Sequence, residues 1–123
     1  MIFRIAFASS DGANVDSHFG AARRFYIAEL DTEKEDYEII ESREVKPSCN
    51  GGSHEVSGFA AALDTLSDVS AIVAQRVGPG ARKYIDERGI AVYQIALSTE
   101  QALCLLMEEK QWEVDKWLSH TKN

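Results

Sequence analysis

Residues 2–8, with the sequence Ile-Phe-Arg-Ile-Ala-Phe-Ala, form a nearly unbroken apolar run near the start of the chain. A strand with one face in water alternates between apolar and polar residues, whereas a strand buried on both faces does not. The run therefore predicts a central strand of a sheet whose two faces are both covered.

The next two apolar segments predict a β-hairpin. Residues 24–30 and 37–45 are predicted strands, and the segment between them, Asp-Thr-Glu-Lys-Glu-Asp, is a charged turn. Strands joined in this way are expected to be antiparallel neighbours. Acidic side chains crowd this region, and we interpret them as the solvated surface of the hairpin.

The pattern then changes to a helical one. From about His54 to Leu66 the apolar residues recur at helical spacing, and Ser53 is the candidate N-cap. Residues 70–75 follow as a short buried strand.

Two more helices are predicted in the second half of the chain. The first covers residues 79–88, with a proline at its first position and Gly89 after its end. A strand over residues 90–95 comes next. The second helix ends near residue 110, and Ser98 with Gln101 matches a capping box at its start.

Three helices and five strands are thus predicted, in the order β β β α β α β α. The second half is a βαβ arrangement, which implies parallel pairing and a right-handed crossover. With a length of 123 residues, the chain is expected to form one domain. The expected fold is α/β, with one mixed five-stranded sheet and helices packed on it, as in the ribonuclease H-like topology.

Composition excludes several classes of partner. The net charge of −7 is opposite to that expected for a protein that neutralises nucleic-acid phosphates. No apolar run approaches the roughly 20 residues needed to span a membrane, and we recognise no amino-terminal signal, so the expected location is the cytoplasm. Two cysteines make no disulfide framework, and Cys104, within an apolar helical pattern, is expected to be a buried small hydrophobic residue.

Three polar segments follow predicted strands and could converge on one site. They are the loop over residues 9–20, which ends in His18-Phe19-Gly20, the segment 49–54, and the segment 76–80. Loops at the ends of buried strands are where α/β proteins place their ligand chemistry. The combined histidines, thiol, free backbone amides and arginines suit a polyanionic or metal-containing ligand.

The turn Gly78-Pro79-Gly80 lies between a predicted strand and a predicted helix. Free amides and the positive end of the helix dipole at such a position favour an anion. The glycines are equally explained by the geometry of the turn itself, and the segment matches neither of the phosphate-loop fingerprints. Both interpretations remain open at this point.

His18, Cys49 and His54 are the candidate metal ligands. Cys49 and His54 lack a second pair to complete a structural zinc site. A thiolate with one or two imidazoles and open coordination would instead suit iron–sulfur material. The alternative is an unreactive loop cysteine with exposed loop histidines, and the residues alone favour that alternative.

Hydrolytic chemistry fits poorly. Residues 2–8 and 70–75 carry no carboxylate, whereas nucleases of the ribonuclease H-like class need carboxylates on their strands to hold metal ions. No nucleophile elbow or Ser-His-Asp order is found. The chain is therefore expected to be a binding protein and not an enzyme.

Four segments, in the order in which they occur, resemble those of a known family. The segments Ala8-Ser9-Ser10-Asp11-Gly12 and Val15-Asp16-Ser17-His18-Phe19-Gly20, followed by Arg24-Phe25 and by Val77-Gly78-Pro79-Gly80-Ala81-Arg82, are similar to those of the dinitrogenase iron–molybdenum cofactor biosynthesis family. That family includes NifX- and NafY-like accessory proteins and the carboxy-terminal part of NifB. The resemblance covers residues 1–107. In the remaining residues 108–123, Trp112, Trp117 and Leu118 predict a short helical extension before a polar tail.

The resemblance implies a small non-enzymatic carrier, linked to nitrogen fixation, that binds iron–molybdenum cofactor, its iron–sulfur precursor or a related metal–sulfide cluster. Its partners would be that metal–sulfide cluster and the proteins that assemble or accept it. His18 is the position expected to contact the cluster, and Cys49 is a second expected metal ligand. The other residues expected to take part in binding are His54, Arg24, Arg76, Gly78, Gly80 and Arg82.

Two alternatives compete with this interpretation. The first is a regulatory module that binds a small molecule or nucleotide at the Gly78-Pro79-Gly80 helix start. Such a module has no need of the histidines or of Cys49, so substituting them should leave nucleotide binding intact. The second is a remnant of a nuclease with the same fold, against which the missing strand carboxylates argue.

Overall fold

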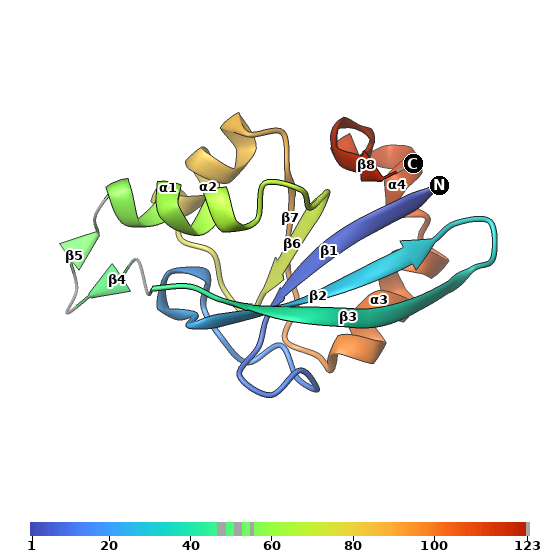
Figure 1. The fold of residues 1–123 in the computed structure, drawn as a ribbon, viewed down its shortest axis with the longest axis horizontal. Coiled ribbons are helices and arrows are strands. Elements are labelled where there is room, and N and C mark those ends of the chain that lie inside the picture. The colour runs from blue at the N-terminus through green and yellow to red at the C-terminus, as the bar shows by residue number, and fades with distance from the viewer. Residues whose placement is uncertain (47–48, 51–52, 55, 123) are drawn as a thin grey trace.

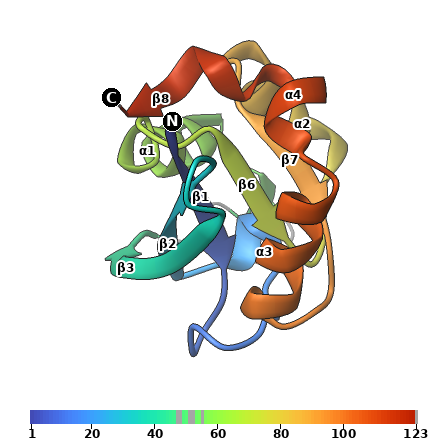
Figure 2. The ribbon, with the colours of Figure 1, turned by 90° about the vertical axis from the view of Figure 1, so that its right-hand side faces the viewer.

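The computed structural model describes residues 1–46, 49–50, 53–54 and 56–122, and it places side chains within residues 1–46 and 58–118. One mixed sheet forms the middle of the molecule, with helices on both of its faces (Figures 1 and 2). The expected α/β architecture is confirmed, and the ribonuclease H-like topology stays a prediction.

The main sheet has the strand order β3-β2-β1-β6-β7. β1 pairs with β2, and β2 with β3, in antiparallel fashion, whereas β1 with β6 and β6 with β7 are parallel pairs. The mixed five-stranded sheet and both predicted kinds of pairing are thereby confirmed. The bounds of these strands are β1 Ile2–Ala8, β2 Arg24–Asp31, β3 Asp36–Glu44, β6 Ala71–Ala74 and β7 Ala91–Gln94.

The apolar β1 is the central strand, as its sequence predicts. Phe3, Ile5 and Phe7 belong to the apolar cluster on one face of the sheet. Ala6 and Ala8 belong to the cluster on the other face. Both faces of β1 are therefore covered. This fixes the point at which the following loop leaves the sheet.

Helices α1 (Val56–Thr65) and α2 (Pro79–Glu87) lie on one face of the sheet, and α3 (Thr99–Glu108) lies on the other (Figure 2). α2 begins with the predicted proline, and Gly89 after its end has a φ of 72°, which suits glycine. At the start of α3, Ser98 and Gln101 form both hydrogen bonds of the predicted capping box.

Two local predictions are wrong. Ser53 is not the N-cap of α1, because it lies in β5 (Ser53–His54), a two-residue strand that pairs with β4 (Cys49–Asn50). Cys104 is exposed and not buried. The buried residues of α3 recur three and four positions apart along one stripe, and position 104 falls outside it.

The chain after α3 packs against the sheet. It contains the short helix α4 (Gln111–Val114), the 3-10 helix η2 (Lys116–His120) and the strand β8 (Thr121–Lys122), which pairs with β1. The Trp117 ring is fully buried, packs edge-on against Phe3 with ring centroids 5.4 Å apart, and donates from Nε1 to the hydroxyl of Tyr93 at 2.8 Å. These residues therefore extend the core.

The hairpin of β2 and β3 forms one edge of the sheet. Most residues of β3 are exposed, and the pairing shifts register beside Ile27 and Ala28, which marks a β-bulge. Acidic side chains and a bulge on an edge strand both hinder pairing with another chain. None of the helices in the described residues combines the length and apolar character needed to cross a bilayer.

Candidate functional site

The loop after β1 is held in a fixed shape by Asp11. Its Oδ1 accepts hydrogen bonds from the amides of Ala13 and Asn14 at 2.8 and 3.0 Å, and these bonds lower the pKa of the carboxyl. Gly12 has a φ of 81°, and a Cβ there would lie 2.9 Å from the Tyr26 ring. The turn therefore requires glycine at this position.

Asp16 closes the other side of the loop. Its Oδ1 accepts from the Ser10 amide and from the Ser17 hydroxyl, each at 2.9 Å, and its Oδ2 accepts from the Ser10 hydroxyl. Burial opposes ionisation of Asp16, but these hydrogen bonds outweigh it, so the pKa of the carboxyl is lowered. Both loop carboxylates are thus engaged in holding the backbone in place.

A backbone ladder joins the end of this loop to the end of β6. The Gln75 amide donates to the Ser17 carbonyl at 3.0 Å, and the Phe19 amide donates to the Arg76 carbonyl at 2.9 Å. Between them, His18 and Arg76 form a parallel bridge. The loop histidine and the segment before α2, which are far apart in the sequence, are therefore side by side, as predicted.

His18 is also the residue before the 3-10 helix η1 (Phe19–Ala21), whose Phe19 is buried in the core. Phe19 packs against Phe25 and Phe59, with ring centroids 5.7 and 6.4 Å apart. The exposed imidazole is consequently attached to a backbone that is fixed on both sides, by the ladder before it and by a buried aromatic ring after it.

A cavity of about 490 Å³ lies beside this histidine, and we refer to it as the His18 cavity. Three of the predicted site residues besides His18 line it, namely Arg76, Gly78 and Gly80. Its complete lining is His18, Gly20, Ala21, Phe59, Arg76, Gly78, Pro79, Gly80 and Ala81. Sequence reasoning missed Phe59 and Ala21, which the helical period and the loop pattern do not distinguish from ordinary packing residues.

Neither Gly78 nor Gly80 is required by crowding. A Cβ at Gly78 would meet nothing within 4 Å, and one at Gly80 would make only an ordinary contact with Phe59 at 4.0 Å. Gly78 is the N-cap of α2 with φ −68° and ψ 158°, a conformation open to any residue. Because glycine has no side chain, the backbone at the amino-terminal end of α2 is uncovered beside the cavity.

Cys49 and His54 lie opposite each other in the β4–β5 pair, and β4 lies against η1. The backbone therefore brings residues 49–50, and with them the paired residues 53–54, toward η1 and the end of the sheet that carries His18. The side chains of Cys49 and His54 lie outside the described residues, so their predicted part in binding stays a prediction. Among the described residues, no group of three or more carboxylates, imidazoles or thiols is placed to hold a metal ion.

Arg24 and Arg82 do not line the His18 cavity. Arg24 lies opposite Glu44 in the β2–β3 pair and donates to its carboxylate at 2.9 Å. Hydrogen bonds to Tyr26 and Glu44 raise the pKa of the Arg24 guanidinium. Arg82 is an exposed residue of α2, so Arg76 is the arginine that the fold places beside His18.

The sequence of the chain is similar to those of known proteins. The chain is 32% identical over 99 residues to the FeMo cofactor biosynthesis protein NifB of Chlorobaculum tepidum, covering 80% of this chain and 22% of that protein. It thus spans about a fifth of that relative. It is also 31% identical over 102 residues to the uncharacterized protein MJ0580 of Methanocaldococcus jannaschii, covering 81% of this chain and 82% of the relative.

Solved structures share the fold. The crystal structure of PH0822 matches with a TM-score of 0.66 at 20% identity, over 86% of this chain and 91% of that one. A second solved structure, from Methanocaldococcus jannaschii, matches with a TM-score of 0.60 at 14% identity, over 89% of this chain and 92% of that one. The family model described as dinitrogenase iron-molybdenum cofactor matches residues 1–109. The chain therefore belongs to the dinitrogenase iron-molybdenum cofactor family.

Proposed function

We propose that this chain is a non-enzymatic carrier that binds iron–molybdenum cofactor, or an iron–sulfur precursor of it, in the His18 cavity. The observation that carries the proposal is the convergence of His18, Arg76 and the uncovered start of α2 on one cavity. Membership of a family concerned with this cofactor supports the choice of cargo. The proteins that deliver and accept the cluster would be its partners.

His18 is the proposed metal ligand. A neutral imidazole is a common ligand of iron, and this one is exposed at the cavity. Because the backbone on both sides of His18 is already fixed, binding orders only the side chain. The Phe59 ring and Ala21 add apolar wall, which lowers the local dielectric and strengthens the electrostatic contacts of a bound cluster.

Arg76 and the start of α2 are proposed to balance the negative charge of the cluster. A guanidinium donates charge-assisted hydrogen bonds, and the positive end of a helix dipole favours an anion. Gly78 and Gly80 allow a bulky cargo to approach the helix backbone closely, since no side chain covers it. The whole protein carries a net charge of −7, so this local arrangement is what would draw an anion to the site.

A carrier must also release its cargo. One imidazole, with open coordination elsewhere, binds a cluster less firmly than a complete set of four ligands would. Cys49 and His54 are proposed as additional ligands on the β4–β5 pair, which lies beside η1. In this scheme His18 holds the cluster against the sheet. Cys49 and His54 add to the affinity, and an acceptor protein can displace them from the cluster.

The test is an anaerobic titration of the full chain with isolated iron–molybdenum cofactor and with an iron–sulfur cluster, followed by absorption spectroscopy. We expect saturable binding by the wild type and binding about tenfold weaker for His18→Ala, the loss of one metal ligand. Cys104→Ser is the matched control, because this exposed thiol lies on α3, which packs on the opposite face of the sheet from α1 and α2.

Equal affinities of the wild type and His18→Ala for both clusters would contradict the assignment of His18. Absence of binding by the wild type to either cluster would contradict the carrier function itself. A nucleotide titrated in parallel distinguishes the regulatory alternative, because a nucleotide held at the start of α2 would bind wild type and His18→Ala alike.

A further inference from the structure

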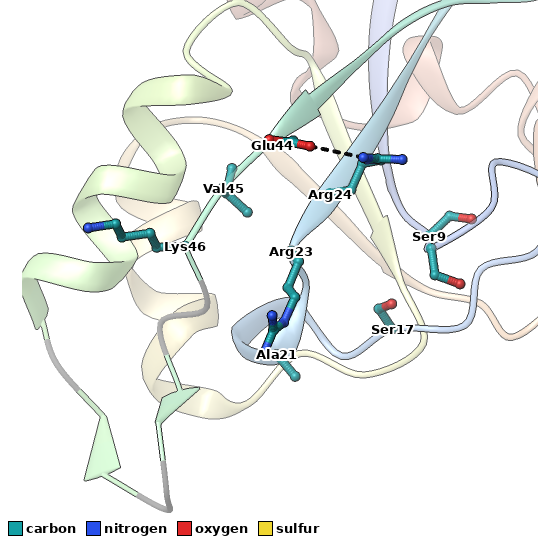
Figure 3. A pocket seen from close by; sticks show the side chains of 9 residues that line it. Ser9, Ser17, Ala21, Arg23, Arg24, Glu44, Val45 and Lys46 are labelled. Atoms are coloured by element: carbon teal, nitrogen blue, oxygen red, sulfur yellow. Dashed lines mark hydrogen bonds and ion pairs between the residues drawn. The ribbon is translucent and has the colours of Figure 1, made fainter.

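A second cavity of about 670 Å³ shares only Ala21 of its lining with the His18 cavity. We refer to it as the serine–arginine cavity. Figure 3 shows Ser9 and Ser17 of the loop on one side of it and Arg23, Val45 and Glu44 on the other. Its complete lining is Ser9, Ser10, Ser17, Ala21, Arg23, Arg24, Glu44, Val45 and Lys46.

The serine side of this cavity offers hydrogen-bond acceptors. The hydroxyls of Ser10 and Ser17 both donate their single hydrogen to the carboxylate of Asp16. The lowered pKa of Asp16 keeps that carboxylate ionised at neutral pH, so it accepts only. The lone pairs of the two hydroxyl oxygens therefore remain available to a ligand that carries O–H or N–H donors.

The opposite side of the cavity is cationic. Three of its residues are basic, Arg23, Arg24 and Lys46, and one is acidic, Glu44. Glu44 is occupied by Arg24, and no described residue pairs with the exposed Arg23 side chain. Lys46 extends away from the serines in Figure 3, so Arg23 is the cation best placed to meet an anion here.

We infer that the serine–arginine cavity is a second binding site, for a small organic anion that carries hydroxyl groups. The anionic group, a phosphate ester or a carboxylate, bonds to the guanidinium of Arg23. The ligand's hydroxyls donate to the oxygens of Ser10 and Ser17. This site is distinct from the proposed cluster site, since the two cavities have no lining residue in common except Ala21.

Two matched pairs of probes test the chemistry. Glycerol 3-phosphate is compared with propyl phosphate, and glycerate with propionate, in titrations of the full chain followed by amide chemical shifts. In each pair the anion is retained and the hydroxyls are removed. We expect saturable shifts in the amides of residues 9–17 and 21–24, with at least threefold tighter binding of the hydroxylated member of one pair. The pair that shows this preference identifies the anionic group.

Arg23→Gln is the informative variant, because it removes one charge from an exposed side chain. We expect it to weaken binding of the preferred anion about fivefold to tenfold, the loss of one charge-assisted hydrogen bond. Lys83→Gln is the matched control, since it changes the net charge equally at an exposed residue of α2 that lines neither cavity.

Shifts that fail to saturate with all four probes would overturn the inference. The inference would also be overturned if Arg23→Gln bound the preferred anion as tightly as the wild type does. It would likewise be overturned if the wild type bound the two members of each probe pair with equal affinity. His18→Ala is expected to bind the preferred anion as the wild type does. Because that variant addresses the cluster site alone, failure of one proposal can be told from failure of the other.

Discussion

His18 lies directly opposite Arg76 in a parallel backbone bridge, although the two residues belong to segments far apart in the sequence. The Phe19 amide donates to the Arg76 carbonyl at 2.9 Å and continues the bridge past the end of β6. The sheet therefore fixes the backbone of both cavity residues before any ligand arrives. Preorganisation of this kind lowers the entropic cost of binding.

Arg76→Gln is expected to weaken cluster binding about threefold to tenfold, with little effect on folding, because the side chain is exposed. Arg76→Lys, which retains the charge, is expected to recover part of the affinity. Titrations at low and high salt measure both effects, since an exposed charge interaction is screened by salt. A wild-type affinity for Arg76→Gln at low salt would exclude a role for this guanidinium.

Gly78→Asp separates stability from binding. A Cβ fits at Gly78, and aspartate is a better N-cap than glycine, so the free energy of unfolding is expected to rise by a few tenths of a kcal/mol. The same carboxylate places a negative charge beside the His18 cavity, and cluster affinity is expected to fall at least tenfold. Urea unfolding and cluster titration measure the two effects.

Gly78→Ser is the control for this prediction, since it supplies a capping oxygen without the charge. It is expected to retain more of the cluster affinity than Gly78→Asp. Wild-type binding by Gly78→Asp would show that the cargo does not approach the start of α2.

Asp68→Asn tests the ion pairs that join β1 and β3 to the turn after α1. Asp68 accepts from Arg4 at 2.6 Å and from Arg43 at 2.6 and 2.9 Å. Its hydrogen bonds from Arg43, opposed by desolvation, lower the pKa of the carboxyl to about 2. After allowance for partial solvent exposure, the substitution is expected to cost about 1–2 kcal/mol at pH 7.

The sign of the pH dependence follows from the lowered pKa. Asp68 stabilises the fold at pH values above its ordinary pKa of 3.8, and this contribution is lost as the pH falls through about 2. The stability difference between wild type and Asp68→Asn should therefore shrink between about pH 4 and pH 2. Asp64→Asn, which removes an exposed pair with Arg88, is the control and should change stability by less than about 1 kcal/mol. A difference for Asp68→Asn that stays constant across this pH range would contradict the role assigned to the ionised Asp68 carboxylate.

Trp117→Ala tests whether the residues after α3 belong to the core. The ring is fully buried against Phe3, and its Nε1 donates to Tyr93, so we expect a loss of about 3–5 kcal/mol of unfolding free energy. Leu118→Ala is the neighbouring control at a side chain that is 58% exposed, and it should cost less than about 1 kcal/mol. Similar small effects for both variants would show that this segment docks only weakly.

Much of the fold could be predicted because the local signals agree with the tertiary structure. The unbroken apolar run of β1 marks a strand covered on both faces, and the capping box at Ser98 marks the start of α3. The exposure of Cys104 was also available from the sequence, since its position lies off the apolar stripe of α3. The prediction that Ser53 is an N-cap was wrong because serine also occurs in strands. Only the β4–β5 pairing shows that Ser53 belongs to a strand.

The site was predictable only in part. The sequence grouped His18 with Arg76 and Gly78 because all follow predicted strands, and the structure places them around one cavity. Arg24 lies elsewhere because the register of the β2–β3 pair sets it opposite Glu44, and register is not readable from one strand. The binding chemistry inferred for the serine–arginine cavity depends on which serine hydroxyls donate to Asp16. These hydrogen bonds follow from the folded shape of the loop and cannot be read from a sequence motif.

The most direct test of cluster binding at His18 is a hyperfine measurement on the full chain, labelled with nitrogen-15 at histidine and loaded with a paramagnetic iron–sulfur cluster. The chain has three histidines, so His18→Ala and His54→Ala are measured beside the wild type. We predict a nitrogen coupling of iron-bound imidazole in the wild type that His18→Ala abolishes. A coupling that persists unchanged in His18→Ala would contradict this prediction.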